Sequence, residues 1–243
     1  MRIFVAGATG VIGKPLVKLL VAAGHDVTGT TRSPAKAGEI EHSGATAAVV
    51  DAFDLDALKL AAADARPEIV IHQLTDLPDL ADPKQMPAAL AANARLRIEG
   101  TYNLIVAAKS AGARRMIAQS ISFMYAPGNK PYRESDPLVA VQDDQPGAVS
   151  ARGVHALEGA VLGTPGIDGI ILRYGRLYGP GTWAAAPTGT GFLHTDAAAQ
   201  AALLAVTRGK PGAYNVAEDD GEVSIEKARH ELGFDPVFRI KAV

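Results

Sequence analysis

Residues 7–13 of the chain read Gly7-Ala8-Thr9-Gly10-Val11-Ile12-Gly13, directly after the short apolar run from Ile3 to Ala6. Beyond them, apolar side chains recur at the spacing of one buried helix face, at Leu16, Leu19, Leu20 and Ala23. The glycines therefore stand between an apolar run that is typical of a buried strand and a helical pattern. The stretch predicts a strand, a tight turn and a helix.

The three glycines of this turn have the spacing of a dinucleotide-binding loop. Glycine allows the tight turn, lets a pyrophosphate approach the backbone, and lets the helix pack closely on the strand. The start of the helix also offers N–H groups and the positive end of its dipole to phosphate. A tight turn without a ligand is the alternative interpretation. We predict a dinucleotide site with contacts from Gly7, Thr9, Gly10, Val11, Ile12 and Gly13.

Apolar strand patterns alternate with helical patterns along most of the chain. Further strands are expected at 27–31, 45–50, 69–72, 115–120 and 169–173, and helices at 54–63, 88–110 and 150–162. Such alternation predicts right-handed βαβ units, and hence a doubly wound parallel sheet of the α/β class. After Gly175 the alternation weakens, with helices expected at 195–207 and 224–232 and a short strand at 213–216. We expect residues 1–175 to form the dinucleotide-binding core and residues 176–243 a small substrate-side lobe that does not fold independently.

Composition excludes several classes of protein. The chain has 243 residues, 48% of them hydrophobic, and a formal net charge of −2. This is ample material for a core, and the near-neutral charge argues against nucleic acid or anionic membrane as a partner. No apolar run approaches the ~18 residues that span a bilayer. Residues 1–7 enter a strand without a cleavable signal pattern, so a cytoplasmic protein is expected.

The inventory of reactive side chains is equally restrictive. The absence of cysteine excludes disulfides, thiolate nucleophiles and Cys-ligated metals. The six histidines show no pair at ligand spacing, so no metal site is predicted.

The end of the second expected strand carries the nucleotide preference. An Asp or Glu there would accept hydrogen bonds from a ribose 2′-OH and favour NAD. This chain has Thr30-Thr31-Arg32-Ser33 instead, and an arginine fork matches a 2′-phosphate. We predict NADP as the cofactor with Arg32 as a contact. NAD, with a merely solvated Arg32, is the alternative.

The glycine pattern resembles the short-chain dehydrogenase/reductase superfamily, specifically its extended, NAD-dependent epimerase/dehydratase-like branch. Further stretches fit this family, namely Asp51 with Asp54, 70–75, Asn93 with 100–104, 172–181, 192–196 and 214–216. The resemblance implies a Rossmann sheet that binds a nicotinamide dinucleotide. It adds expected cofactor contacts at Asp51, Ala52, Gln73, Leu74, Thr75, Tyr174 and Arg176.

The catalytic signature of the family is missing. In the family a Tyr and a Lys, four residues apart on one helix, face the nicotinamide, and the Lys lowers the pKa of the Tyr so that it can move a proton. A Glu follows four residues after the Lys, and Glu158 matches it, which places Ser150 at the Tyr position and Val154 at the Lys position. The supporting Ser or Thr of the family falls on Ile121. The chain resembles the atypical members, with the cofactor site retained and the proton relay lost.

Three hydroxyls remain as candidates for chemistry, Tyr125, Ser122 and Ser120. Tyr125 follows the fifth expected strand on the substrate side, and a structural aromatic that packs the loop is its alternative. Ser120 and Ser122 alternate along the strand, so one of them could orient a substrate carbonyl, or both could bond the local backbone. His155 adjoins the Lys position, but neighbours in sequence do not share a helix face.

Two functional hypotheses follow. The first is an NADP-dependent oxidoreductase or epimerase-like enzyme that acts on a small organic molecule with a non-standard proton donor. The second is a non-catalytic NADP(H)-binding redox sensor. The retained aromatic positions, among them Tyr178 and Trp183, favour the first, because a sensor needs no substrate cavity. The short stretch after Gly181 leaves little room for a nucleotide sugar, and the alanine-rich stretch 196–206 could pack on a partner subunit, which leaves a homodimer open.

Overall fold

A seven-stranded parallel sheet forms the centre of the molecule. The computed structural model describes residues 1–78, 82–142 and 147–240. The strand order is β3-β2-β1-β4-β5-β6-β9, and every neighbouring pair is parallel. The strands are β1 (Arg2–Ala6), β2 (Asp26–Thr31), β3 (Thr46–Val49), β4 (Ile69–His72), β5 (Arg115–Ile121), β6 (Asp168–Tyr174) and β9 (Gly212–Val216). The predicted doubly wound α/β class is confirmed.

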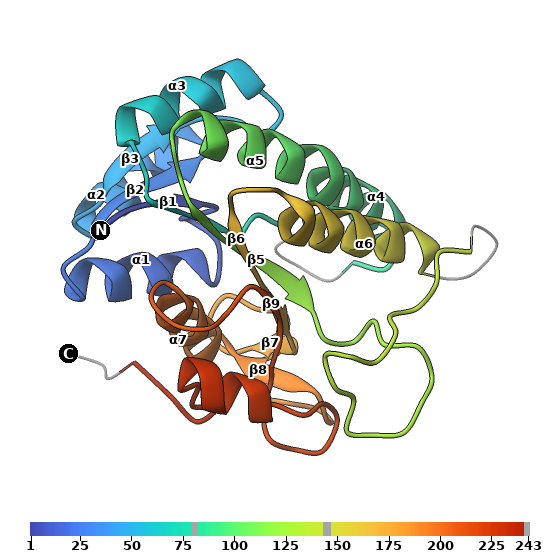
Figure 1. The fold of residues 1–243 in the computed structure, drawn as a ribbon. Coiled ribbons are helices and arrows are strands. Elements are labelled where there is room, and N and C mark those ends of the chain that lie inside the picture. The colour runs from blue at the N-terminus through green and yellow to red at the C-terminus, as the bar shows by residue number, and fades with distance from the viewer. Residues whose placement is uncertain (79–81, 143–146, 241–243) are drawn as a thin grey trace.

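Helices cover both faces of this sheet (Figure 1). They are α1 (Gly13–Ala22), α2 (Ala37–His42), α3 (Leu55–Ala65), α4 (Met86–Arg95), α5 (Thr101–Ser110), α6 (Ala148–Gly163) and α7 (Thr195–Ala205). Residues of α1 and α7 share one core cluster with Ile3 and Val5 of β1. Residues of α3, α5 and α6 share the other with Phe4 and Ala6. Because side chains alternate along a strand, β1 is apolar throughout and buried on both faces.

The long helix expected at 88–110 is one helical rod with a change of pitch inside it. It begins at Met86, passes through a π-helical segment η2 (Leu96–Gly100), and ends with α5 at Ser110. A π-turn inserts an extra residue per turn, and such insertions occur frequently at functional sites. Apolar spacing alone does not reveal the insertion, because the buried stripe continues across it.

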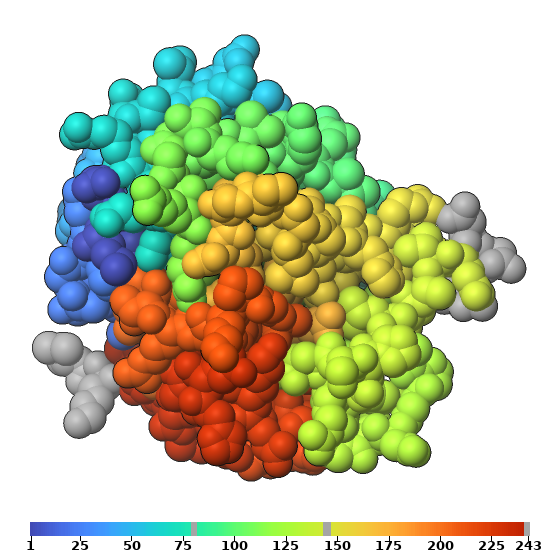
Figure 2. All heavy atoms as spheres, in the orientation of Figure 1, coloured from blue at the N-terminus to red at the C-terminus, as the bar shows by residue number. Residues whose placement is uncertain are grey.

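The chain beyond residue 175 contributes to the same core. β9 pairs with β6 at the edge of the main sheet, and α7 lies beside α1. Figure 2 shows the orange and red surface of this part against the yellow-green surface of the segment before α6, where Tyr132 bridges to Val223. The division of the chain at residue 175 stays a prediction.

Two details of the C-terminal part differ from expectation. Two strands, β7 (Arg176–Tyr178) and β8 (Phe192–His194), pair in parallel and were not predicted, because three residues are too few for a visible period. The helix expected at 224–232 covers only residues 226–232, of which η3 (Ala228–Leu232) is π-helical. In the N-terminal half, a short 3₁₀ turn η1 (Pro34–Lys36) leads into α2. In the described ranges no helix is long and apolar enough to cross a membrane.

Candidate dinucleotide and substrate site

The glycine loop lies at the carboxyl end of β1, beside β4, where the strand order reverses. In open α/β sheets the crevice at this point is where ligands bind. Gly7 has φ of 90°, and a side chain there would meet the Gln73 carbonyl oxygen at 2.7 Å. A Cβ on Gly13 would lie 2.0 Å from the Gly7 carbonyl oxygen. Both glycines are therefore required by the turn itself.

Gly10 is different. It is exposed, it has no positive φ, and a Cβ there would meet only the Gly7 carbonyl oxygen, at 3.4 Å. The turn has room for a side chain at this position, so packing does not explain the glycine. A ligand that approaches the backbone closely does explain it. The residues present thus fit a bound pyrophosphate.

The loop is tied to the next strand. The Gly7 N–H donates to Thr30 Oγ1 at 3.3 Å, and the Thr9 hydroxyl lies 3.5 Å from Thr31 Oγ1. Val11 is exposed beside them, while Ile12 is buried and precedes the first residue of α1. The predicted loop residues are therefore brought together at the end of β1 and the start of α1.

Arg32 and the acidic turn lie at the ends of β2 and β3. Arg32 is exposed and forms an ion pair with Asp76 of the loop after β4, with 3.0 Å between Nη2 and Oδ1. The Asp76 N–H in turn donates to Asn93 Oδ1. Asp51 accepts a hydrogen bond from the Phe53 N–H, and the carbonyl of Ala52 accepts one from Asn103. Asp76 was not among the site residues predicted from the sequence.

Gln73 occupies the space between the glycine loop and β6. Its Nε2 donates to the Tyr174 hydroxyl at 3.3 Å, and that hydroxyl donates to the carbonyl of Ala198. Burial raises the pKa of Tyr174, so it stays protonated. Among the described residues, Gln73 Oε1 is the one fully buried side-chain oxygen or nitrogen without a partner.

The other expected contacts on this side are less enclosed. Leu74 is half-buried, and its carbonyl accepts from Gln119 Nε2 at 3.1 Å. Thr75 is exposed. Arg176 is exposed as well, and its guanidinium lies over the ring of Phe123, 4.6 Å from the ring centre.

His72 ends β4 in a fully buried position. Burial lowers its pKa to about 3, with a further contribution from the charge of Arg97, so the ring is neutral. Nδ1 accepts from the Leu74 N–H at 3.2 Å, which leaves the proton on Nε2, directed at Thr101 Oγ1 at 3.1 Å. His72 therefore fixes the backbone that leads into the Gln73–Thr75 segment.

A buried ion pair occupies the centre of the candidate catalytic region. Arg173 of β6 binds Glu158 of α6 through two hydrogen bonds of 3.0 and 2.7 Å. Burial opposes the charge of Arg173, but the hydrogen bonds and charge of Glu158 raise its pKa overall. The Ser120 hydroxyl donates to the same carboxylate at 2.7 Å. Glu158, seen in the sequence only as an alignment marker, is thus the partner of two buried groups.

Tyr125 belongs to the same network. Its hydroxyl accepts from Arg173 Nη1 at 2.8 Å and donates to Asn215 Oδ1 at 2.7 Å. Its ring stacks on Tyr132, with 5.2 Å between the ring centres. Burial raises the pKa of Tyr125. This placement favours the structural interpretation of Tyr125, and its catalytic role stays a prediction.

The two positions of α6 at which the family has its relay hold neither an acid nor a base. Val154 is buried, and Ser150 is half-buried one turn before it. Ser122 is buried after the end of β5, where its N–H donates to the carbonyl of Tyr174. His155 is exposed and lies 2.8 Å from the carbonyl of Val139.

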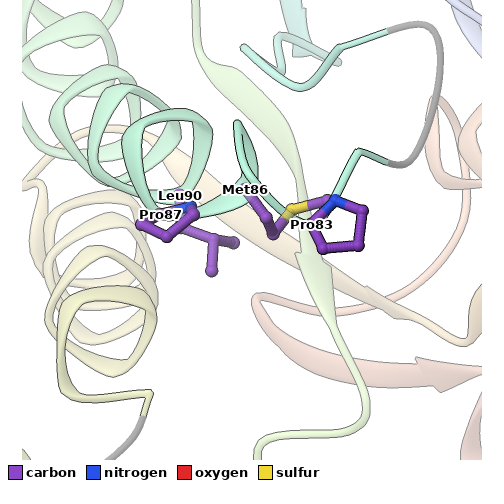
Figure 3. Close-up of a pocket in the computed structure, with 4 residues that line it drawn as sticks. All are labelled: Pro83, Met86, Pro87 and Leu90. Atoms are coloured by element: carbon purple, nitrogen blue, oxygen red, sulfur yellow. The ribbon is translucent and has the colours of Figure 1, made fainter.

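The structure also bears on the binding of ligands other than a dinucleotide, namely small apolar molecules and metal ions. An apolar hollow of about 490 Å³ lies at the start of α4, lined by Pro83, Met86, Pro87 and Leu90 (Figure 3). None of the predicted site residues lines it. Within the described ranges, no three His, Asp or Glu side chains gather as metal ligands.

The strand order, the switch point and the glycine loop define a doubly wound α/β protein whose glycine turn fits a phosphate group. The sequence profile of the NAD dependent epimerase/dehydratase family matches residues 3–194. The chain belongs to this family.

Two reductases are among the proteins with a similar sequence. A 3-diazoavenalumate denitrifying reductase from a Streptomyces species is 42% identical over 240 residues, which cover 90% of this chain and 77% of that protein. Cinnamoyl-CoA reductase 1 of rice is 35% identical over 121 residues, 48% of this chain and 33% of that protein.

Solved structures share the fold at lower identity. A UDP-glucose 4-epimerase from Thermotoga maritima has a TM-score of 0.80 at 17% identity, with 98% of this chain and 94% of that chain covered. The enzyme of the same name from Thermus thermophilus, solved with NAD, has a TM-score of 0.73 at 22% identity, with 97% and 85% covered. These structures show the fold.

Proposed function

We propose that the protein is an NADP-dependent reductase of a small organic substrate whose reduction needs no acidic side chain. One observation carries this proposal: the two positions of the family's proton relay hold Ser150 and Val154, and the hydroxyl of Tyr125 is committed to Arg173 and Asn215. A carbonyl that accepts a hydride becomes an alkoxide and needs a proton. A substrate that instead loses a leaving group does not.

The substrate class is inferred from the reductase that is 42% identical, whose name specifies the denitrifying reduction of a diazo compound. Replacement of an aryl diazonium group by hydrogen breaks the C–N bond, forms a C–H bond and releases N₂. It consumes one hydride and no proton, so it fits a site without the relay. When bound, the reduced nicotinamide cofactor would supply that hydride.

This chain's own residues would hold the cofactor. The backbone of the glycine loop would accept the pyrophosphate at Gly10, and Arg32 would pair with a 2′-phosphate in exchange for Asp76. The absence of an acidic residue at the end of β2 supports NADP.

The test measures whether the hydride of the cofactor is transferred to the substrate. Purified protein is incubated with 4-methoxybenzenediazonium and NADPH deuterated at C4, on either face in separate samples, and deuterium in the arene and N₂ are measured. We expect transfer from one face only. The Gly10→Asp variant controls for reduction in free solution. Faster turnover of an aldehyde or of UDP-glucose would contradict the proposed substrate class, and NADPH binding without any turnover would favour the sensor hypothesis.

The cofactor assignment has its own test. Arg32→Ala should weaken NADPH binding by about 1.5–3 kcal/mol, the scale of hydrogen bonds to charged groups, and leave NADH binding nearly unchanged. Asp76→Ala is the matched control, since it removes the competing partner and should not weaken NADPH binding. Equal losses for both cofactors in Arg32→Ala would exclude a 2′-phosphate contact.

A further inference from the structure

Arg97 is a buried cation without a partner. It lies on the π-helical segment η2, and only 7% of its surface is exposed. In the described part of the chain, no hydrogen bond or ion pair reaches its guanidinium. Its nearest opposite charge is Glu158, whose carboxylate is already bound by Arg173 and Ser120. A guanidinium that is this little exposed loses most of its hydration without gaining a partner, which is costly.

The aliphatic stem of the Arg97 side chain is packed against α6, whereas its guanidinium head is accessible to solvent. A Cβ on Gly153 of α6 would lie 3.3 Å from Arg97 Cδ and 3.0 Å from Ala94 Cα, so this glycine makes room for the stem. In residues 1–78, 82–142 and 147–240, Gln73 Oε1 is the one fully buried side-chain nitrogen or oxygen that lacks a hydrogen-bond partner. The unpartnered nitrogens of Arg97 are therefore not fully buried, and the small exposed part of the residue includes its head.

The position of this cation relates to the missing relay. Its stem contacts Gly153 of α6, one residue from Val154, the position at which the family carries its lysine, and therefore on the adjoining face of the helix. The positive charge of Arg97 is close enough to His72, at the end of β4, to help lower the pKa of that ring. Burial lowers the pKa of Arg97 to about 10, so it is charged at neutral pH.

We propose that the guanidinium of Arg97 binds an anionic oxygen of the substrate, a carboxylate or a phenolate, and so supplies from η2 the positive charge that the family supplies from α6. The assignment of this ligand to the substrate rests on the proposed function. A charge-assisted contact of this kind would give the desolvated guanidinium the partner that the protein does not provide.

The experiment measures binding, not turnover. The full chain, saturated with NADP⁺, is titrated with 4-hydroxybenzoate and with the neutral 4-hydroxybenzamide, followed by ligand-observed NMR. We expect the carboxylate to bind at least about tenfold more tightly than the amide, and Arg97→Met to abolish this preference. Arg97→Lys should retain part of it. Arg95→Met is the control, because Arg95 is exposed on the preceding turn and pairs with Glu99.

Two further readouts separate the alternatives. NADPH affinity should be unchanged in Arg97→Met; a fall in NADPH affinity with the carboxylate preference intact would overturn the proposal in favour of a cofactor contact. The melting temperature of ligand-free Arg97→Met should equal or exceed that of the wild type, because an unpartnered buried charge is removed. A lower melting temperature with intact carboxylate preference would also overturn it. Failure of the hydride-transfer assay affects neither readout.

Discussion

Gly10 and Gly13 are both glycines of one loop, but they are required for different reasons. Gly13→Ala should lower the free energy of unfolding, because its Cβ would overlap the Gly7 carbonyl oxygen. Gly10→Asp should fold normally and lose dinucleotide binding, because its carboxylate would occupy the place of the pyrophosphate. Urea denaturation and NADPH fluorescence titration measure the two effects, with Gly10→Ala as the control for the added Cβ. Full NADPH affinity in folded Gly10→Asp would mean that the loop is only a turn.

At the same scale, His72 makes a prediction about pH. Its folded-state pKa of about 3 lies below the ordinary value of 6.5, so between these pH values the unfolded chain binds a proton that the folded chain does not. Stability should therefore fall as pH is lowered from 6.5, by up to about 1.4 kcal/mol per pH unit from this residue. His72→Gln removes this contribution. The difference in unfolding free energy between the two proteins, measured at pH 7 and pH 5, should shrink at the lower pH.

At the scale of the element, α6 contains a matched pair of glycines. A Cβ on Gly159 would meet nothing within 4 Å, whereas a Cβ on Gly153 would press on Ala94 and Arg97. Gly159→Ala should stabilise the protein by about 0.5–1 kcal/mol through helix propensity. Gly153→Ala should lose that gain and destabilise the protein, because α6 and α4 would have to separate. Similar melting temperatures for the two variants would show that the close approach of α4 and α6 is not needed.

Most elements are visible in the sequence because burial imposes a period on them. β4 was predicted with the bounds that it has, and the ends of β5, β6 and α6 differ by one or two residues. The π-helical pitch of η2 was not predicted, since it shifts the helix face without interrupting the apolar stripe. The sequence did contain a signal for Arg97. It is a charged residue at a position of the expected helix that the spacing of the apolar residues places on the buried face.

At the scale of the whole molecule, one polar network joins β5, α6, β6 and β9. Tyr125→Phe removes a hydroxyl that serves both Arg173 and Asn215, and should lower the free energy of unfolding by about 1–3 kcal/mol. Tyr102→Phe, at an exposed position of α5, is the control and should change it by no more than about 0.5 kcal/mol. If Tyr125→Phe instead abolished hydride transfer in a protein of unchanged stability, the catalytic prediction for Tyr125 would be correct.

The glycine loop was easier to predict than the buried network around Glu158. The glycine loop consists of residues that are adjacent in the sequence, so its pattern can be recognised from a short stretch of the chain. The partners of Glu158, in contrast, come from Ser120 and Arg173, on strands that only the folded sheet brings next to α6. A single sequence contains no pattern for such pairings, and the ion pair was therefore not predicted.

The pairing of β9 with β6 also has a consequence for synthesis of the chain. Until residues 212–216 have left the ribosome, β6 is the edge of the sheet, and its central residues, Ile170 to Leu172, are apolar. Unpaired apolar edges are templates for association with other chains. The nascent protein therefore passes through an interval in which β6 has emerged but its outer edge is uncovered. A chaperone would be most useful during that interval, when it could cover the exposed edge of β6. Slow translation between residues 175 and 212 would lengthen the interval and so increase the risk of aggregation.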